Sequence, residues 1–115
     1  MKNIDSEIKQ DYNRAVNLWN ETYSHCKIVD LKGKNLSVEP MFDICLDIFA
    51  SKCKNILDFG CGTGDVIFQC YEFGNMNYGL GVDLSQTGIE YARKMTLVNN
   101  YHGLNFDVGD ISYFD

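Results

Sequence analysis

The order of hydrophobic and polar positions predicts two helices, followed by three strands that alternate with two further helices. Apolar side chains recur at steps of three and four residues from about Ser6 to Ser24, which is typical of one face of a helix. They are Ile8, Tyr12, Val16, Trp19 and Tyr23. We expect this face to cover another part of the protein, with its aromatic residues serving to pack the helix. A second apolar stripe follows Ser37, with Pro40 in the first turn, and predicts a helix over residues 37–50.

From residue 54 onward the pattern alternates between strands and helices. "NILDF" (55–59) is a short apolar strand, and "YGLGVD" (78–83) and "LNFDV" (104–108) alternate as strands. The segments between them, "GDVIFQCYEF" and "SQTGIEYARKM", have helical spacing, and Ser85 is the expected N-cap of the second. Strands separated by helical crossovers lie parallel, with right-handed connections and helices on the sheet faces. We therefore predict one α/β domain over residues 1–115, with helices in 1–53 and a βαβαβ part in 54–115.

Composition and charge narrow the range of possible partners and sites. The chain is 45% hydrophobic, which is ordinary for one globular domain, and its net charge of −6 disfavours nucleic acid and anionic membrane surfaces as partners. The sequence shows no signal peptide and no apolar run long enough for a membrane span, so we expect a cytoplasmic protein. Five cysteines without C-x-x-C spacing argue against a disulfide framework and a structural zinc site, and no metal is predicted.

Three glycines follow the first strand directly. Gly60, Gly62 and Gly64 remove side chains where the chain turns sharply into a helix, which leaves backbone and free helix N–H groups open to a ligand. The dinucleotide fingerprint G-x-G-x-x-G fails at its sixth position, where Asp65 stands, and the Walker loop requires a lysine at that same place. The loop therefore indicates a nucleoside-type ligand, with a dinucleotide as a less well matched alternative.

Two further motifs follow the glycine loop in order. "ILDFGCGTG", "GVDLS" and "NFDVGDI", together spanning residues 56–111, resemble the first three motifs of the class I S-adenosylmethionine-dependent methyltransferases. The resemblance implies a Rossmann-like parallel sheet with S-adenosylmethionine lying across the carboxyl ends of its first strands. This cofactor carries a sulfonium and an ammonium but no phosphate, so its site tolerates carboxylates that a pyrophosphate site would not.

The resemblance also implies a set of cofactor-binding residues. Asp83 ends the second strand, where its carboxylate is placed to accept both ribose hydroxyls. Asp110 would face the exocyclic amine of adenine, while Ile111 and Leu84 would pack on the two sides of its ring. The full set is Asp58, Gly60, Cys61, Gly62, Gly64, Asp83, Leu84, Asp110 and Ile111.

Each assignment has a structural alternative. The glycines alone are compatible with a tight turn that binds nothing. For Asp83 the alternative is a cap of the helix near Ser85, and for Asp58 it is a role in holding the glycine loop without touching the cofactor. Asp110 is also compatible with a solvated turn. Trp19 and Tyr23 are expected to pack the first helix, and the alternative for them is to line the methionine end of the cofactor pocket. Cys61 is not predicted as a nucleophile because neither histidine lies near it in the sequence, and no catalytic residue is identified.

The predicted function is S-adenosylmethionine binding and methyl transfer to a small-molecule or protein acceptor. The alternatives are a fragment of an NAD(P)-dependent oxidoreductase and a non-catalytic module that binds a partner. Members of the resembled family continue after the third strand with further strands that complete the sheet and supply most of the acceptor site. The chain ends at Asp115, so we expect a truncated domain that is inactive alone. Its first strand would then have an open apolar edge that favours self-association or a second chain.

Overall fold

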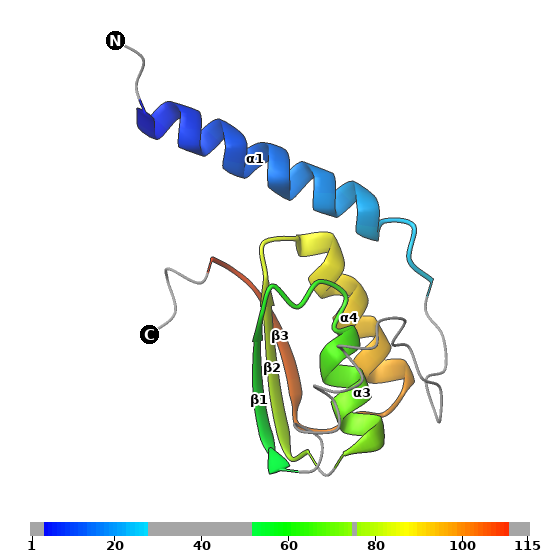
Figure 1. Ribbon diagram of the computed structural model, residues 1–115. Helices are drawn as coiled ribbons and strands as arrows, with labels where there is room; N and C mark the ends of the chain where they lie inside the picture. The colour runs from blue at the N-terminus through cyan, green and yellow to red at the C-terminus, as the bar shows by residue number, and fades with distance from the viewer. Residues whose placement is uncertain (1–3, 28–51, 75, 111–115) are drawn as a thin grey trace.

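The computed structural model describes residues 4–27, 52–74 and 76–110, and side chains from residue 6 onward. The described part forms one three-stranded sheet in the order β1-β2-β3, with three helices (Figure 1). The elements are α1 (Ile4–Tyr23), β1 (Asn55–Phe59), α3 (Asp65–Phe73), β2 (Tyr78–Asp83), α4 (Gln86–Val98) and β3 (Leu104–Val108). These bounds confirm the predicted strands and all the predicted helices except the one over residues 37–50. That helix and Ile111 lie outside the described residues.

Both strand pairs are parallel, as predicted. β1 pairs with β2 from Asn55 opposite Tyr78 onward, and β2 pairs with β3 from Gly79 opposite Leu104 onward. Because the three strands lie in chain order, two right-handed crossovers bring their helices to the same side of the sheet. Figure 1 shows α3 and α4 together on that side. Within the described ranges, no helix covers the opposite side.

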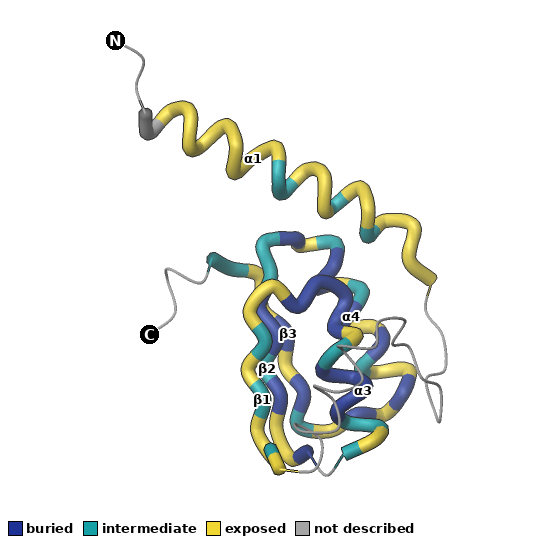
Figure 2. Tube along the Cα trace, in the orientation of Figure 1, coloured by how far each residue is buried: buried dark blue, intermediate teal, exposed yellow. Residues whose placement is uncertain are grey.

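The hydrophobic core lies between the sheet and these two helices (Figure 2). A Cβ atom added at Gly81 of β2 would lie 2.6 Å from the Phe106 ring, so this strand has a glycine where a large side chain of β3 must pack. Helix α4 begins as predicted, because the Ser85 hydroxyl accepts a hydrogen bond from the Gly88 N–H at 3.1 Å. The core side chains contributed by the three elements include Ile67, Phe68, Cys70, Ile89, Ala92, Met95, Leu104 and Phe106.

The opposite face of the sheet carries apolar side chains. Gly79 and Gly81 face the helices, so the alternate residues of β2 and their partners on β1 face the other way. Leu57 of β1 is 57% exposed there, and Tyr78 of β2 is 66% exposed. The apolar residues on this open face are Leu57, Phe59, Tyr78 and the partly exposed Leu80, whereas Val82, which points the same way, is buried.

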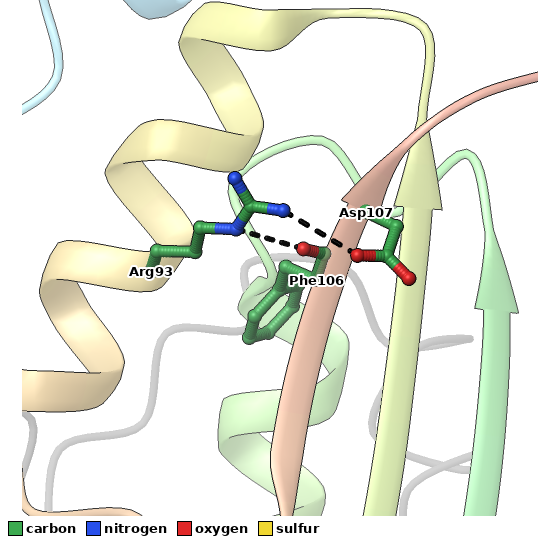
Figure 3. Close-up of polar contacts among 3 residues, drawn as sticks. All are labelled: Arg93, Phe106 and Asp107. Atoms are coloured by element: carbon green, nitrogen blue, oxygen red, sulfur yellow. Dashed lines mark hydrogen bonds and ion pairs between the residues drawn. The ribbon is translucent and has the colours of Figure 1, made fainter.

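The two edges of the sheet differ. At β3, the Arg93 guanidinium donates from Nε to the Phe106 carbonyl oxygen at 2.8 Å and pairs with the Asp107 carboxylate at 3.4 Å (Figure 3). A cationic side chain thus covers the outer edge of β3. Among the described residues, strand β1 has a neighbouring strand on one side only. The backbone N–H and C=O groups of Asn55 and Leu57 point away from β2, toward the open side of β1.

Helix α1 meets the rest of the protein at its C-terminal end. Ile8 is 60% exposed and Tyr12 41% exposed, and Figure 2 shows the first turns of the helix exposed around the axis. The apolar face that was predicted to cover another part of the protein is therefore exposed along the N-terminal half of α1, as far as the described residues extend. None of the described helices is both long enough and apolar enough to cross a membrane.

Candidate functional site

A cavity of about 470 Å³ lies at the carboxyl ends of the three strands. This is the edge at which open α/β sheets bind their ligands, and the volume falls within the range of roughly 300–1,000 Å³ typical of small-molecule sites. Its wall combines two carboxylates, two glycines and several large apolar side chains. The lining residues are Trp19, Tyr23, Phe59, Gly60, Val82, Asp83, Leu84, Gly109 and Asp110.

The three glycines of the loop have different surroundings. All have positive φ, at 78° for Gly60, 57° for Gly62 and 87° for Gly64. A Cβ atom at Gly60 would meet no atom of the described residues within 4 Å, whereas one at Gly62 would lie 2.6 Å from the Tyr23 hydroxyl oxygen. At Gly64 the added atom would lie 3.0 Å from each of two core phenylalanine rings. The bare backbone that faces the cavity is therefore at Gly60, while this chain's own rings fill the space beside Gly62 and Gly64.

Asp83 connects the glycine loop to the start of α4. Its Oδ2 accepts a hydrogen bond from the Gly62 N–H and its Oδ1 accepts one from the Ser85 N–H, both at 2.8 Å. The capping side chain of α4 is Ser85 itself, so Asp83 is not the cap. A carboxylate offers about four lone-pair sites, so each oxygen keeps capacity for a second donor. The two N–H groups thus orient a carboxylate that also lines the cavity.

Asp58 lies apart from this cavity. It lines a second cavity of about 270 Å³ between β1 and α3, together with Cys53 and Cys70. Burial, with a smaller contribution from the Asp83 charge, raises the pKa of the Asp58 carboxyl. The carboxylate that accepts a bond from the glycine loop is that of Asp83.

Cys61 is a core residue. Its side chain is 8% exposed, and burial followed by the charges of Asp58 and Asp83 raises the pKa of its thiol to about 12. A thiol with this pKa is protonated at neutral pH, and the thiolate is the reactive form. The environment of Cys61 agrees with the expectation that it is not a nucleophile.

The structure brings four of the predicted residues to one cavity wall. Gly60, Asp83, Leu84 and Asp110 line it, from the ends of β1, β2 and β3. The other described candidates do not line this cavity: they are Asp58, Cys61, Gly62 and Gly64. Ile111 is outside the described residues.

Two aromatic residues of α1 also line the cavity, which was the less favoured of the two roles considered for them from the sequence. Trp19 and Tyr23 stack with ring centroids 5.5 Å apart and an interplanar angle of 22°. Packing was the expected role, and Tyr23 does pack against the glycine loop. Their spacing of four residues indicates one helix face, but the cavity that this face meets is formed by residues far along the chain.

One comparison with known proteins shows the family of the chain, and another shows its fold. The model of a family described as a methyltransferase domain matches residues 50–115. No curated protein matches the sequence. Among solved structures, a SAM-dependent methyltransferase from Geobacter sulfurreducens in complex with S-adenosyl-L-homocysteine has a TM-score of 0.62, at 19% identity over 85% of this chain and 38% of that one.

Two other solved structures share the fold. A SAM-dependent methyltransferase from Thiobacillus denitrificans, also in complex with S-adenosyl-L-homocysteine, has a TM-score of 0.59, at 22% identity over 84% of this chain and 38% of that one. YjhP from E. coli has a TM-score of 0.57, at 18% identity over 80% of this chain and 36% of that one. These similarities show a shared fold, and the chain spans less than half the length of each of the three structures.

Proposed function

Because the chain belongs to the methyltransferase-domain family, we propose that it binds S-adenosylmethionine and serves in methyl transfer to an acceptor. When bound, this cofactor supplies an activated methyl group on its sulfonium. The complexes of two structural neighbours with S-adenosyl-L-homocysteine support the choice of cofactor. The rest of the proposal depends on the chemistry of the cavity at the strand ends.

The observation that carries the proposal is the charge of the cavity wall. Asp83 and Asp110 contribute carboxylates, Trp19 and Tyr23 contribute electron-rich rings, and no lysine or arginine is among the described residues that line it. Carboxylates and aromatic faces attract cations and repel phosphates. Such a wall suits a ligand with a sulfonium and an ammonium, and it is unfavourable for the pyrophosphate of NAD(P), the alternative cofactor.

The residues fit distinct parts of the adenosyl group. Asp83, oriented by two backbone N–H groups, is placed to accept hydrogen bonds from ribose hydroxyls. Leu84 offers an apolar surface for the adenine ring, and Asp110 offers an acceptor for its exocyclic amine. Gly60 lets the ligand approach the backbone, because a Cβ atom there would have no neighbour within 4 Å among the described residues.

Calorimetric titration of the 115-residue chain tests the cofactor. We expect binding of S-adenosylmethionine and S-adenosyl-L-homocysteine and none of NAD. Binding of NAD alone would favour the oxidoreductase alternative, and binding of none of the three would favour a non-catalytic module.

We place the methyl acceptor among small molecules or proteins, because a net charge of −6 repels nucleic acid. In the neighbours compared above, most of the chain lies outside the matched part. We infer that acceptor contacts come from the part of the fold that this chain does not match in those neighbours, so the 115-residue chain should bind cofactor without turnover. Catalysis requires the acceptor to be held within roughly 3–3.5 Å of the methyl carbon, in line with its bond to sulfur. A labelled-methyl assay over a broad acceptor panel measures this, and steady turnover would contradict it.

We further propose that the open edge of β1 and the open face beside it bind a second copy of this chain. The exposed side chains of Leu57 and Tyr78 give this surface its apolar character, and Arg93 leaves β1 as the more accessible edge. Sedimentation analysis over a range of concentrations tests the proposal, and a monomer at all concentrations would contradict it.

We also propose that the protein is located in the cytoplasm. The four described cysteines, Cys26, Cys53, Cys61 and Cys70, are free thiols, which is typical of proteins in reducing compartments. Fractionation of cells that express the tagged chain tests the location, and recovery outside the cytoplasmic fraction would contradict it.

A further inference from the structure

The C-terminal end of α1 is fitted to the glycine loop by its tyrosine. A Cβ atom at Gly62 would lie 2.6 Å from the Tyr23 hydroxyl oxygen, and one at Gly88 would lie 2.7 Å from Cδ2 of the same ring. Real Cβ atoms do not approach other heavy atoms so closely, so the ring occupies a notch that exists because both positions are glycine. Gly62 belongs to the loop and Gly88 to the first turn of α4, so a single side chain bridges these two elements.

A second contact fixes the helix at the same place. The Asn20 side-chain oxygen accepts a hydrogen bond from the Ser85 hydroxyl at 2.6 Å and another from the Thr87 N–H at 3.2 Å. Both donors lie at the start of α4, and the Thr87 N–H is one of the first N–H groups of a helix, which have no partner within it. Asn20 and Tyr23 therefore set how α1 lies across the ends of the strands.

This placement brings two stacked rings to the mouth of the cavity. Trp19 lies one turn before Tyr23 and lines the same wall as Asp83 and Leu84. Trp19 is 46% exposed, which is unusual for a tryptophan whose role is only to anchor a helix. Burial, and then the Asp83 charge, raise the pKa of the Tyr23 hydroxyl to about 12, so this group is a hydrogen-bond donor at neutral pH.

We propose that the C-terminal end of α1 is part of the adenosyl-binding site, with Trp19 and Tyr23 contacting the bound ligand and Asn20 acting as their positioning residue. This inference rests on the proposed function. An aromatic side chain against a base or a sulfonium adds stacking or cation–π attraction, and the half-exposed indole gains this contact only when ligand is present. Asn20 does not line the cavity, so its effect on affinity is exerted through the two rings.

The fluorescence of Trp19 tests the contact directly, because it is the only tryptophan in the chain. Titration with S-adenosyl-L-homocysteine should shift or quench its emission, with the same dissociation constant that calorimetry gives. Calorimetric binding without any change in emission would overturn the proposal.

Variants of the two rings and of the positioning residue give the second test. Trp19→Leu and Tyr23→Leu should each weaken binding about tenfold, at the lower end of the range of stacking contacts. Asn20→Ala should weaken binding and also lower the emission anisotropy of Trp19, while Asn20→Asp keeps an acceptor oxygen and should restore both. Leu18→Ala, at a site 61% exposed on the same helix, is the matched control and should change neither.

The outcomes separate this inference from the proposed function. If the wild-type chain binds neither S-adenosylmethionine nor S-adenosyl-L-homocysteine, the proposed function fails and the role of α1 fails with it. If the wild-type chain binds and the Trp19 and Tyr23 variants bind within twofold of it, only the role of α1 is wrong. Circular dichroism of each variant checks the fold, and the half-exposed Trp19 carries the test if the Tyr23 variant unfolds.

Discussion

Asp83 has two tasks at the residue scale, because it holds backbone N–H groups and also faces the cavity. Asp83→Ala should weaken S-adenosylmethionine binding by roughly tenfold to a hundredfold, since a charge-assisted hydrogen bond contributes about 1.5–3 kcal/mol and each decade of affinity corresponds to about 1.4 kcal/mol. Calorimetry measures the change. Asp11→Ala, which removes an exposed carboxylate from α1, controls for net charge. A loss of less than twofold would mean that Asp83 serves only the local backbone.

Substitutions at Gly62 test whether the glycine loop and Tyr23 act together in cofactor binding and in stability. Gly62→Val should abolish cofactor binding in a folded protein, because a branched side chain at φ +57° is strained and collides with the Tyr23 hydroxyl group. A double-mutant cycle separates the two causes. Gly62→Ala should reduce the free energy of unfolding by less in a Tyr23→Leu background than in the wild type. Equal reductions in both backgrounds would show that backbone strain alone matters at this position.

The raised pKa of the Asp58 carboxyl predicts that the stability of the fold depends on pH. Its pKa in the folded protein is raised by burial above the ordinary value of 3.8, so the folded state holds the proton more tightly than the unfolded state does. Stability from this group is therefore present below that ordinary value and is lost as the pH rises through the folded pKa. Asp58→Asn should then increase the free energy of unfolding at pH 7 and have a smaller effect at pH 3.5. Urea unfolding at both pH values measures this, and a larger gain at pH 3.5 would contradict it.

At the scale of the elements, the sequence pattern correctly predicted the helices and strands that depend on short-range interactions. The alternation of β2 and β3, the Ser85 cap and the buried stripe from Ile89 to Met95 on α4 all follow from spacing and from short-range hydrogen bonds. Parallel pairing followed from the helical crossovers between the strands. These features do not depend on what the rest of the chain does.

Features that depend on distant contacts were not predictable in the same way. The periodicity of α1 shows that one face is apolar, but it does not show which part of that face is covered, and Ile8 and Tyr12 are exposed. In the candidate site, Gly60 and Asp83 could be placed because each stands at the end of a strand, and Asp110 was assigned from the resemblance of its motif. Asn20 could not, since its partner Ser85 lies 65 residues further along the chain.

At the scale of the whole molecule, the described part of the protein has a covered side and an open side. Helices α3 and α4 pack on one face of the sheet (Figure 1). Leu57 and Tyr78 are exposed on the other face. Exposed apolar side chains beside an open strand favour association. The Arg93 contacts to β3 leave β1 as the strand more open to pairing, so association should be sensitive to charge on β1.

Leu57→Lys tests this surface, because it places a charge on the open face of β1. Burying a leucine contributes roughly 1.5–3 kcal/mol, so losing that burial in a dimer should raise the dissociation constant at least about tenfold. Leu97→Lys is the matched control, since Leu97 is 77% exposed on α4, away from β1. Sedimentation velocity over a concentration series should show the wild type and Leu97→Lys associating alike, and Leu57→Lys shifted toward monomer. If all three associate equally, the contact lies on another surface of the molecule, and the open side of the sheet is not the site of self-association.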